Sequence, residues 1–467
     1  MKLEIPVKVK GILDVLTAHG YEAFVVGGCV RDSILGREPD DWDVTTSARP
    51  EEVKAVFHRT VDTGLQHGTV TVLMGGEGYE VTTYRIDGEY EDGRHPREVA
   101  FTASLEEDLK RRDFTINAMA YHPQAGLVDL FGGMEDLQRR VIRCVGDARE
   151  RFTEDALRIL RAVRFSAQLG FRIEDKTREA LAWMAPNLVH VSAERIQVEL
   201  VKLLVSPHPD YLRVAWETGI TARFLPEFDR MMETEQNTPH HCYTVGEHTL
   251  CSLPLISPDK VLRLAMLLHD VGKPAVRTTD GQGRDHFKGH AQAGEKMAGS
   301  ILRRLKFDND TIRKVCRLVK WHDDRPLPEE RQVRRAIARI GADLFPFYLQ
   351  VQRADMLAQS LYQREEKRSR LEQVEKLYRK ITDEKQCVSL KEMRISGKEL
   401  LELGAQPGPG IGRILDELLE EILEEPSRNE SEWLRKRAEE KLEEMAGHPD
   451  QPEREAGICK NNRNRNE

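Results

Sequence analysis

The stretch Val25-Val-Gly-Gly-Cys-Val-Arg-Asp-Ser-Ile-Leu-Gly36, followed by Asp40-Asp-Trp-Asp-Val-Thr-Thr46, decides how the N-terminal part of the chain folds. Its apolar run ends in Gly27 and Gly28 and opens into a short helix. Glycines leave the backbone N–H groups at the start of a helix uncovered, so a phosphate group can approach them. The stretch therefore predicts an anion-binding turn between a strand and a helix.

A pair of acidic residues follows this turn. Asp41 and Asp43 flank Trp42, and in a β-type segment the period of two places both carboxylates on one face and the indole on the other. The carboxylates repel each other unless a divalent cation lies between them, and Mg²⁺ shared with substrate phosphates is the usual cation. The local hypothesis is a nucleoside triphosphate on the glycine turn with Mg²⁺ on Asp41 and Asp43. Taken singly, a Gly-Gly pair is usually a plain turn, and an Asp-x-Asp pair usually binds no metal.

Composition limits the kinds of protein that the chain can form. Its 467 residues, 39% hydrophobic and 32% charged, indicate a soluble, helix-rich protein of about two to four domains. No apolar run approaches the roughly 20 residues of a membrane helix, and the N-terminus lacks the apolar segment of a signal peptide, so we expect no membrane partner and a cytoplasmic location. Seven scattered cysteines without a Cys-x-x-Cys pair indicate reduced thiols. With a net charge of −8, any nucleic-acid surface must be a local patch.

The ordered combination of the Gly-Gly turn, Arg31-Asp32, Leu35-Gly36 and Asp-x-Asp resembles the signature of class II tRNA nucleotidyltransferases and bacterial poly(A) polymerases. These are members of the polymerase β superfamily. The resemblance implies an α+β polymerase β-like nucleotidyltransferase head, followed by an all-α neck, an HD domain and a helical tail. The implied reaction is in-line attack of an RNA 3′-hydroxyl on the α-phosphate of CTP or ATP, with Mg²⁺ as the cofactor. The nucleotide-binding residues that it implies at the turn are Gly27, Gly28 and Arg31.

Two strands are predicted after the acidic pair, at Thr69–Met74 and Tyr79–Arg85. On the second strand, Glu80 would lie beside the Asp pair as a third carboxylate that supports the metal or accepts the proton of the attacking hydroxyl. A solvent-facing strand glutamate is the alternative. The polar run between Asp87 and Lys110 predicts a mobile loop. This loop resembles that of complete CCA-adding enzymes rather than the shortened loop of CC-adding ones.

The segment Arg111–Ala120 is the second candidate for nucleotide binding. Arg112, Asp113 and Asn117 lie just before or on one helical face, where cationic and amide groups can reach a triphosphate and a ribose. By itself the segment would be an ordinary capped helix. In the resembled family this run is the second nucleotide-site motif, and the match is nearly complete.

The segment Thr153–Phe165 is expected to form a helix that reads the nucleobase. Asp155 and Arg158 are three residues apart and so project side by side. Cytosine and adenine both present an amino donor next to a ring-nitrogen acceptor, whereas uracil and guanine present a carbonyl next to an N–H. A carboxylate beside a guanidinium fits the first pair, and a buried mismatch costs about 1–3 kcal/mol per unpaired group. A surface ion pair is the alternative. Arg161 is expected to orient Asp155 or to hold phosphate.

Two later segments resemble supporting parts of the family. Ser192–Leu200 is predicted to be an amphipathic helix capped by Ser192, and the family's last short motif implies that it braces the base-reading helix through Glu194, Arg195 and Glu199. The glycine-rich segment Pro407–Gly412, between two helices, would offer backbone N–H groups to an RNA strand. A plain helix end and turn is the alternative.

From about residue 215 the chain carries a second set of residues suited to metal binding. His269-Asp270 follows the apolar run Val261–Leu268, where a buried imidazole and carboxylate are costly unless they bind metal. The set resembles the HD phosphohydrolase superfamily, and suitable divalent ions are Mn, Ni, Co, Fe or Mg. The resemblance implies core ligands His248, His269, Asp270 and Asp355, second-metal ligands His290 and His322, and Lys273 as a phosphate partner. A degenerate HD fold that serves as an RNA-binding helical body is the alternative.

These observations predict a nucleotidyltransferase head at 1–147, a nucleotide-reading neck at 148–214, an HD domain at 215–360, a tRNA-binding tail at 361–447 and a disordered end at 448–467. The expected function is addition of CCA to the 3′ end of tRNA from CTP and ATP without a nucleic-acid template, with phosphomonoester or cyclic-phosphate hydrolysis by the HD domain. The alternatives are a poly(A) polymerase, a partial CC- or A-adding enzyme and, in another class, an HD phosphohydrolase with a nucleotide-binding module. Homodimer formation is left open.

Overall fold

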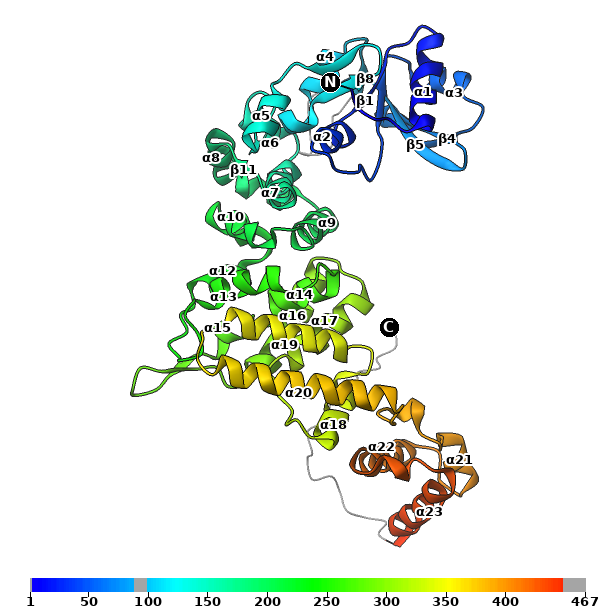
Figure 1. Cartoon of the computed structure of the whole chain (residues 1–467), viewed down its shortest axis with the longest axis vertical. Coiled ribbons are helices and arrows are strands. Elements are labelled where there is room, and N and C mark those ends of the chain that lie inside the picture. The colour runs from blue at the N-terminus through cyan, green and yellow to red at the C-terminus, as the bar shows by residue number, and fades with distance from the viewer. Residues whose placement is uncertain (1, 88–98, 448–467) are drawn as a thin grey trace. The chain divides into compact units, whose positions relative to one another are not determined.

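The chain folds into an α/β part near its N-terminus and a long series of helices (Figure 1). The computed structural model describes residues 2–87 and 99–447. Most of the predicted mobile loop, at 88–98, and the predicted disordered end at 448–467 lie outside these ranges. Contacts divide the chain into two compact units, one containing residues 1–323 and 350–364 and the other containing residues 324–349 and 365–467.

The first unit begins with a seven-stranded mixed sheet of order β3-β4-β5-β2-β1-β8-β9. All neighbouring strands are antiparallel except β2 and β5, which run parallel with Val44 opposite Val81. Val25, near the end of β1, lies opposite Val44 at the start of β2. The turn after β1 and the segment before β2 therefore share one edge of the sheet. The strands are β1 (Ala23–Val26), β2 (Val44–Thr46), β3 (Thr60–Gly64), β4 (Thr69–Met74), β5 (Glu77–Thr83), β8 (Met119–His122) and β9 (Gly126–Asp129).

Short helices pack on this sheet and connect its strands. Helices α1 and α3 contact each other as well as the sheet, and α2 contacts β1 and β8. A separate two-stranded ladder joins β6 to β7. These elements are α1 (Val7–Ala18), α2 (Gly28–Ile34), α3 (Pro50–Val56), β6 (Arg85–Asp87), β7 (Val99–Phe101), α4 (Leu105–Lys110), the 3₁₀ turn η2 (Thr115–Asn117) and α5 (Gly133–Arg139).

The predicted strand at Thr69–Met74 is confirmed as β4. The predicted strand at Tyr79–Arg85 is divided between β5 and β6. The expected β-type segment around Trp42 is only partly confirmed, because Asp41 and Asp43 precede β2 rather than belong to it. A backbone hydrogen bond still ties this segment to β1, because the Val26 N–H donates to the Asp43 carbonyl at 3.1 Å.

The helices after the head differ from the prediction at one important point. The expected single helix at Thr153–Phe165 is two helices, because Asp155 has an extended backbone and its carboxylate accepts a hydrogen bond from the Leu157 N–H at 3.0 Å. Helix α7 packs along α9, and Ser192 makes no side-chain cap at the start of α9. The elements of this region are α6 (Ala148–Glu154), α7 (Leu157–Leu169), α8 (Asp175–Met184) and α9 (Ala193–Leu204), with the short strands β10 (Val141–Ile142) and β11 (Arg172–Ile173).

A helical layer completes the first unit. Helix α17 packs against both α14 and α16, and α14 is apolar and buried along almost its whole length. This layer contains α10 (Leu212–Glu217), α11 (Thr221–Phe224), α12 (Pro226–Glu233), α13 (Val245–Ser252), α14 (Lys260–Leu268), α15 (Lys273–Val276), β12 (Thr278–Thr279), β13 (Asp285–His286), α16 (His290–Arg304), α17 (Asn309–Trp321) and the larger part of α19 (Phe345–Ala358).

The second unit has its own apolar core, in which Leu400, Ile414, Leu418 and Leu434 are buried. Only the first two residues of the glycine-rich segment at Pro407–Gly412 lie outside a helix, because α22 begins at Pro409. Pro409 has the fixed backbone that suits the first helical position, so the later glycines belong to the helix. The helices are α18 (Glu330–Ile340), α20 (Arg364–Asp383), α21 (Gly397–Glu402), α22 (Pro409–Glu424) and α23 (Ser431–Gly447).

The described residues also bear on two expectations from composition. The cysteines among them are free thiols, as predicted, at positions 29, 144, 242, 251, 316 and 387. Within residues 2–87 and 99–447, no helix combines the length and the apolar character that crossing a membrane requires.

Candidate active site

The glycine turn after β1 is built so that only glycine fits at its first position. Gly27 has a φ of 83°, and a Cβ atom there would lie 3.0 Å from Nη1 of Arg112. The Gly27 N–H donates to the Met119 carbonyl on β8 at 3.2 Å, which ties the turn to the sheet. Helix α2 begins directly after it, at Gly28. The turn thus brings backbone and the Arg112 guanidinium unusually close together.

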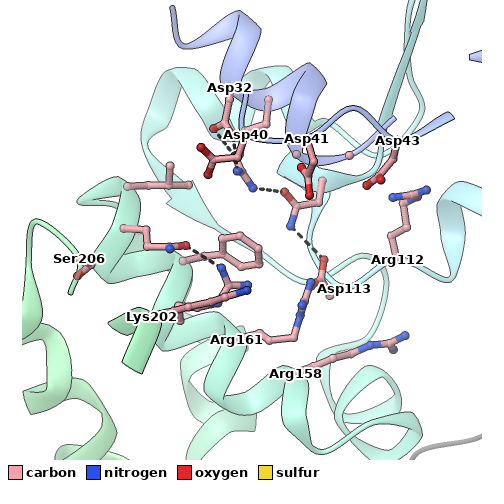
Figure 2. Close-up of a pocket in the computed structure, with 18 of the residues that line it drawn as sticks. Asp32, Asp40, Asp41, Asp43, Arg112, Asp113, Arg158, Arg161, Lys202 and Ser206 are labelled. Atoms are coloured by element: carbon pink, nitrogen blue, oxygen red, sulfur yellow. Dashed lines mark hydrogen bonds and ion pairs between the residues drawn. The ribbon is translucent and has the colours of Figure 1, made fainter. Parts of the chain in front are cut away.

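This turn opens into a pocket of about 910 Å³ within the first unit (Figure 2). Head and helical residues both line it. Figure 2 shows Asp41 and Asp43 on the side opposite Arg158 and Arg161. The predicted site residues that the pocket brings together are Gly27, Gly28, Arg31, Asp41, Asp43, Arg112, Asp113, Asn117, Asp155, Arg158 and Arg161. Sequence reasoning missed other lining residues, among them Arg37, Asp40, Arg164, Phe165 and Lys202.

Negative charge accumulates at the acidic pair. Burial, together with repulsion from Asp41 and Glu80, raises the pKa of Asp43 to about 6, and Arg112 only partly offsets these effects. Glu80 lies on β5 next to β2 but is exposed and does not line the pocket. Carboxylate oxygens that repel one another are the ligands that Mg²⁺ prefers. The acidic pair therefore fits a bound Mg²⁺, with Glu80 close to it rather than inside the pocket.

A continuous polar network crosses the floor of the pocket. Arg31 donates to the Asn117 side-chain oxygen at 2.6 Å, and the Asn117 amide donates to Asp113 at 3.2 Å. Arg161 donates to the other oxygen of Asp113 at 2.8 Å. Burial raises the pKa of Asp113, but Arg161 and Arg158 outweigh it and hold the pKa at about 2. The network keeps Asp113 ionised and fixes the side chains that the sequence assigned to the ribose and the triphosphate. Arg161 thus holds Asp113, whereas the sequence predicted that it would orient Asp155 or hold phosphate.

The two proposed base-reading residues do not form the predicted i,i+3 pair. Asp155 accepts two hydrogen bonds from Arg195 on α9, at 3.1 and 2.7 Å. Arg158 donates to Glu154 and, at 2.9 Å, to the Arg111 carbonyl. Asp155 lies outside the helix that carries Arg158, and both residues line the same pocket.

Helix α7 also carries a buried arginine that the sequence analysis did not select. Arg164 packs over the Phe165 ring at 3.7 Å and pairs with Glu199 on α9 at 2.5 Å. The repeat of arginine at 158, 161 and 164, one helical step apart, was the signal that could have found it. Two of the three predicted bracing residues, Arg195 and Glu199, thus contact the base-reading region.

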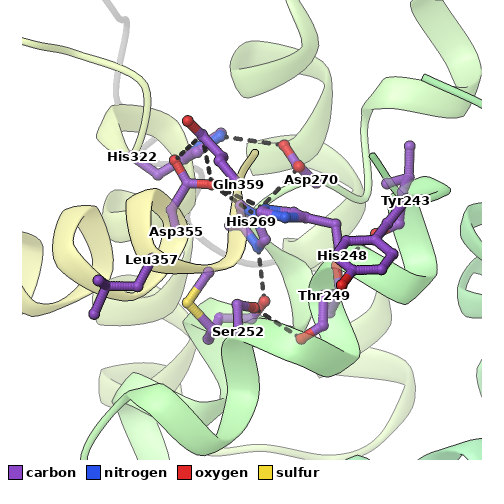
Figure 3. A network of polar contacts seen from close by, with 12 residues as sticks. Tyr243, His248, Thr249, Ser252, His269, Asp270, His322, Asp355, Leu357 and Gln359 are labelled. Atoms are coloured by element: carbon purple, nitrogen blue, oxygen red, sulfur yellow. Dashed lines mark hydrogen bonds and ion pairs between the residues drawn. The ribbon is translucent and has the colours of Figure 1, made fainter. Parts of the chain in front are cut away.

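The histidines of the first unit converge on a second, buried centre (Figure 3). His248 lies 2.9 Å from Asp355, His269 lies 3.2 Å from Asp270, and His269 lies 3.9 Å from Asp355. One possible set of metal ligands is His248, His269 and Asp270, whose ligand atoms lie within 4.8 Å of one another. Burial raises the pKa of Asp270, but His269 and Lys273 hold it well below its usual range.

A second ligand set shares Asp270 with the first. His290 and His322 lie 3.7 and 3.4 Å from one Asp270 oxygen, and these three residues also place ligand atoms within 4.8 Å of one another. Nδ1 of His269, His290 and His322 each lies 2.7 to 2.9 Å from a backbone carbonyl. A carbonyl only accepts, so each Nδ1 donates a proton to it, and Nε2 is the ring nitrogen left to ligate a metal. Lys273 lies 2.7 Å from Asp270.

Models of known protein families match three parts of the chain, and the first of these parts is the head. A family model described as "Poly A polymerase head domain" matches residues 23–143, which contain the glycine turn and the acidic pair. Models described as "Probable RNA and SrmB- binding site of polymerase A" and as tRNA nucleotidyltransferase domain 2 match residues 170–232 and 288–438. The N-terminal part is thus a polymerase β-like nucleotidyltransferase head followed by helical parts of the same kind of protein.

Similarity to individual proteins narrows this class. A CCA-adding enzyme of Bacillus cytotoxicus is 36% identical over 430 residues, which cover 91% of this chain and 96% of that protein. A crystal structure of the Bacillus stearothermophilus CCA-adding enzyme in complex with CTP is 30% identical, covers 94% of this chain and 98% of that one, and has a TM-score of 0.73. The chain belongs to the family of CCA-adding enzymes.

Several relatives match only part of the chain, at higher identity. A CCA-adding enzyme of Leuconostoc mesenteroides is 58% identical over 194 residues, which are 42% of this chain and 48% of that protein. The chain spans about half the length of this and several other curated relatives that it matches.

Proposed function

We propose that the chain adds CCA to the 3′ end of tRNA, with CTP and ATP as the nucleotide donors. The observation that carries this proposal is the pocket, which joins the glycine turn, the acidic pair and Asp155 and Arg158 in one space. The relative from Bacillus stearothermophilus, crystallised with CTP, supports a nucleotide as the ligand. The residues of the buried histidine centre do not line this pocket.

Different residues of the pocket bind different parts of the nucleotide and the metal. The backbone N–H groups that follow Gly27 and the Arg112 guanidinium hold the triphosphate. Asp113 and Asn117, fixed by Arg31 and Arg161, orient the ribose. Mg²⁺ held by Asp41 and Asp43 would supply charge stabilisation for the attacking and leaving oxygens.

The chemistry is displacement at the α-phosphate. The RNA 3′-oxygen forms the new phosphorus–oxygen bond, pyrophosphate leaves, and the hydroxyl proton passes to a base. Glu80 is the proposed proton acceptor because it is exposed and lies close enough to Asp43 to influence its pKa. An Asp155 carboxylate and an Arg158 guanidinium together match the edge of cytosine and adenine, so both donors are accepted and UTP and GTP are rejected.

The direct test uses tRNA transcripts that end before the first C, after one C and after both, followed by sequencing of the products. We expect all three to be completed to CCA. Asp41→Asn and Asp43→Asn should each lower incorporation at least about 100-fold, because each removes an oxygen ligand and a charge from the Mg²⁺ site. Asp62→Asn, on the exposed strand β3 of the same head, is the matched control and should retain activity.

The same assay separates the alternatives. Long A tails would indicate a poly(A) polymerase, and products that stop after CC or grow only from CC would indicate a partial enzyme. Full incorporation by both acidic-pair variants would overturn the site assignment. Phosphoester hydrolysis by a parent protein that adds no nucleotide would favour the HD phosphohydrolase with a nucleotide-binding module.

We propose a second activity for the histidine centre, namely metal-dependent hydrolysis of phosphomonoesters or cyclic phosphates on RNA ends. The supporting observation is that Nδ1 of His269, His290 and His322 each donates to a backbone carbonyl, which leaves three Nε2 atoms near Asp270 to ligate a metal. These ligands fit Mn, Ni, Co, Fe or Mg ions. Lys273 beside Asp270 supplies a cation for the phosphate.

The test of this second proposal measures metal content as well as hydrolysis. His269→Ala and Asp270→Ala should each lose bound divalent metal and hydrolysis of an RNA 2′,3′-cyclic phosphate, while nucleotide addition persists. His286→Ala, an exposed histidine paired with Asp280 outside both ligand sets, is the control. A parent protein that binds metal but hydrolyses nothing would identify a degenerate HD body instead.

A further inference from the structure

One carboxylate beneath the pocket is not assigned to the reaction by any of the motifs above. Asp108, on α4, has no exposed surface. One of its oxygens accepts two hydrogen bonds from Arg111, at 3.0 and 2.7 Å, and lies 3.4 Å from the Arg85 backbone N–H. The other oxygen accepts from the Thr45 hydroxyl at 3.0 Å and lies 3.6 Å from the Arg112 guanidinium. A buried charge needs this many partners to be stable.

The partners of Asp108 come from separate parts of the reaction site. Thr45 is on β2, two positions after Asp43. Arg112 lines the pocket next to Gly27 and opposes the negative charge at Asp43. Arg111 also lines the pocket, and its backbone carbonyl accepts the Arg158 guanidinium at 2.9 Å. A single buried carboxylate therefore contacts the strand that follows the acidic pair, the arginine proposed to hold the triphosphate, and the residue whose carbonyl supports Arg158.

We propose that Asp108 is a positioning residue for nucleotidyl transfer, which holds Arg112 off Asp43 and fixes β2 and Arg111 at the distances that the pocket requires. The inference rests on the proposed nucleotide-adding function. Three anions lie within electrostatic reach of Arg112, namely Asp108, Asp43 and Asp113. Asp113 is already held by Arg161 and Asn117. If the Asp108 charge is removed, we expect Arg112 to turn toward Asp43, because an unpaired buried guanidinium seeks a carboxylate that is not yet paired. A guanidinium on Asp43 competes with Mg²⁺ for the same oxygens.

Because of this competition, loss of the Asp108 charge should change the Mg²⁺ dependence of the reaction. Loss of a purely structural residue should not. The variant Asp108→Asn keeps the shape of the side chain and removes its charge. We expect the Mg²⁺ concentration for half-maximal CTP addition to rise about fivefold or more, and kcat/KM for CTP to fall at least tenfold. Asp136→Asn is the matched control, since Asp136 is an equally buried head carboxylate held by Thr115 and Arg143 at 2.6 and 3.1 Å outside the pocket.

The comparison of the two variants decides the proposal. Asp136→Asn should lower the thermal midpoint to a similar extent but leave the Mg²⁺ half-saturation within twofold of the parent. Equal Mg²⁺ and CTP dependence in both variants would show that Asp108 only stabilises the fold. If Asp108→Asn does not fold, Thr45→Val removes one contact of the same carboxylate and should shift the Mg²⁺ half-saturation in the same direction. No shift in Thr45→Val would then overturn the proposal.

A binding measurement keeps this inference separate from the proposed function. Calorimetric titration of CTP with Mg²⁺ into the RNA-free protein reports on the pocket without turnover. Weaker Mg²⁺-dependent CTP binding in Asp108→Asn than in Asp136→Asn supports the positioning role even if the parent protein adds no nucleotide to tRNA. Unchanged binding in Asp108→Asn, with a parent protein that does add CCA, contradicts the positioning role alone.

Discussion

At the scale of single residues, backbone conformation and close approach together determine what the glycine turn tolerates. Gly27 and Gly76 have almost the same positive φ, 83° and 84°. They differ in their surroundings, since a Cβ at Gly27 meets Arg112 at 3.0 Å and a Cβ at Gly76 meets nothing within 4 Å. The pair therefore separates backbone strain from the geometry of the pocket.

Gly27→Ala and Gly76→Ala should both lower the free energy of unfolding by about 1–3 kcal/mol, because an L residue rarely adopts a positive φ. The larger loss is expected at Gly27, whose ψ of −127° lies outside the left-handed helical region. Only Gly27→Ala should also weaken CTP binding, because its new methyl group displaces the Arg112 guanidinium. Denaturant unfolding and calorimetric CTP titration measure the two effects. Equal CTP affinity in the two variants would show that the turn is not part of the nucleotide site.

The raised pKa of Asp43 predicts how pH and Mg²⁺ act together. In the folded chain this pKa is about 6, above the usual value of about 3.9. The stability that a protonated Asp43 contributes is therefore present below about pH 4 and lost as the pH rises through about 6. Mg²⁺ competes with the proton, so it should raise the thermal midpoint more at pH 7.5 than at pH 5. In Asp43→Asn this pH-dependent part of the Mg²⁺ effect should disappear; its persistence would mean that the metal binds elsewhere.

At the scale of elements, the sequence predicted secondary structure that depends on local residue patterns. It missed features that depend on partners far along the chain. The alternating apolar residues of Thr69–Met74 gave β4 correctly, because strand period and burial are local properties. The helix break at Asp155 was missed because its partner Arg195 lies 40 residues further along the chain. The same holds for Arg161, which pairs with Asp113, 48 residues before it. Of the predicted catalytic and nucleotide-binding residues of the head and neck, all but Glu80 line the pocket, but local spacing did not give their pairing and missed other lining residues.

The contact between α9 and the start of α7 predicts a specific loss of selectivity. Arg195→Met keeps an apolar stem of similar length but leaves Asp155 without its two hydrogen bonds. We expect discrimination of CTP and ATP against UTP and GTP to fall about tenfold, since a mobile carboxylate no longer presents a fixed acceptor. Primer extension with each nucleotide measures the ratio. Arg178→Met, which disrupts the half-exposed Arg178–Glu217 pair of the same region, should leave the ratio unchanged.

At the scale of the whole molecule, the two compact units have separate apolar cores. The second unit carries the predicted tRNA-binding tail, and the first carries the nucleotide pocket. Binding of tRNA and binding of CTP should therefore respond to different mutations. The sequence anticipated a helical tail, but composition alone could not show that residues 324–349 fold with it.

Leu418→Ala tests this separation. Leu418 is fully buried in the core of the second unit, so its truncation should cost that unit about 2–5 kcal/mol. We expect weaker tRNA binding and an earlier unfolding transition, with unchanged CTP affinity. Leu401→Ala, at a 43% exposed position of the same unit, is the control. Loss of CTP affinity in Leu418→Ala would show that the units are energetically coupled.

Before any nucleotide arrives, Asp155 is engaged by Arg195 and Arg158 by Glu154. An incoming base must therefore compete with side chains of the protein itself. With the proposed base-reading role, cytosine and adenine would place a donor and an acceptor in the order that replaces these partners, whereas uracil and guanine would present them in the reverse order. Rejection of the wrong nucleotide would then begin as a failed exchange of partners.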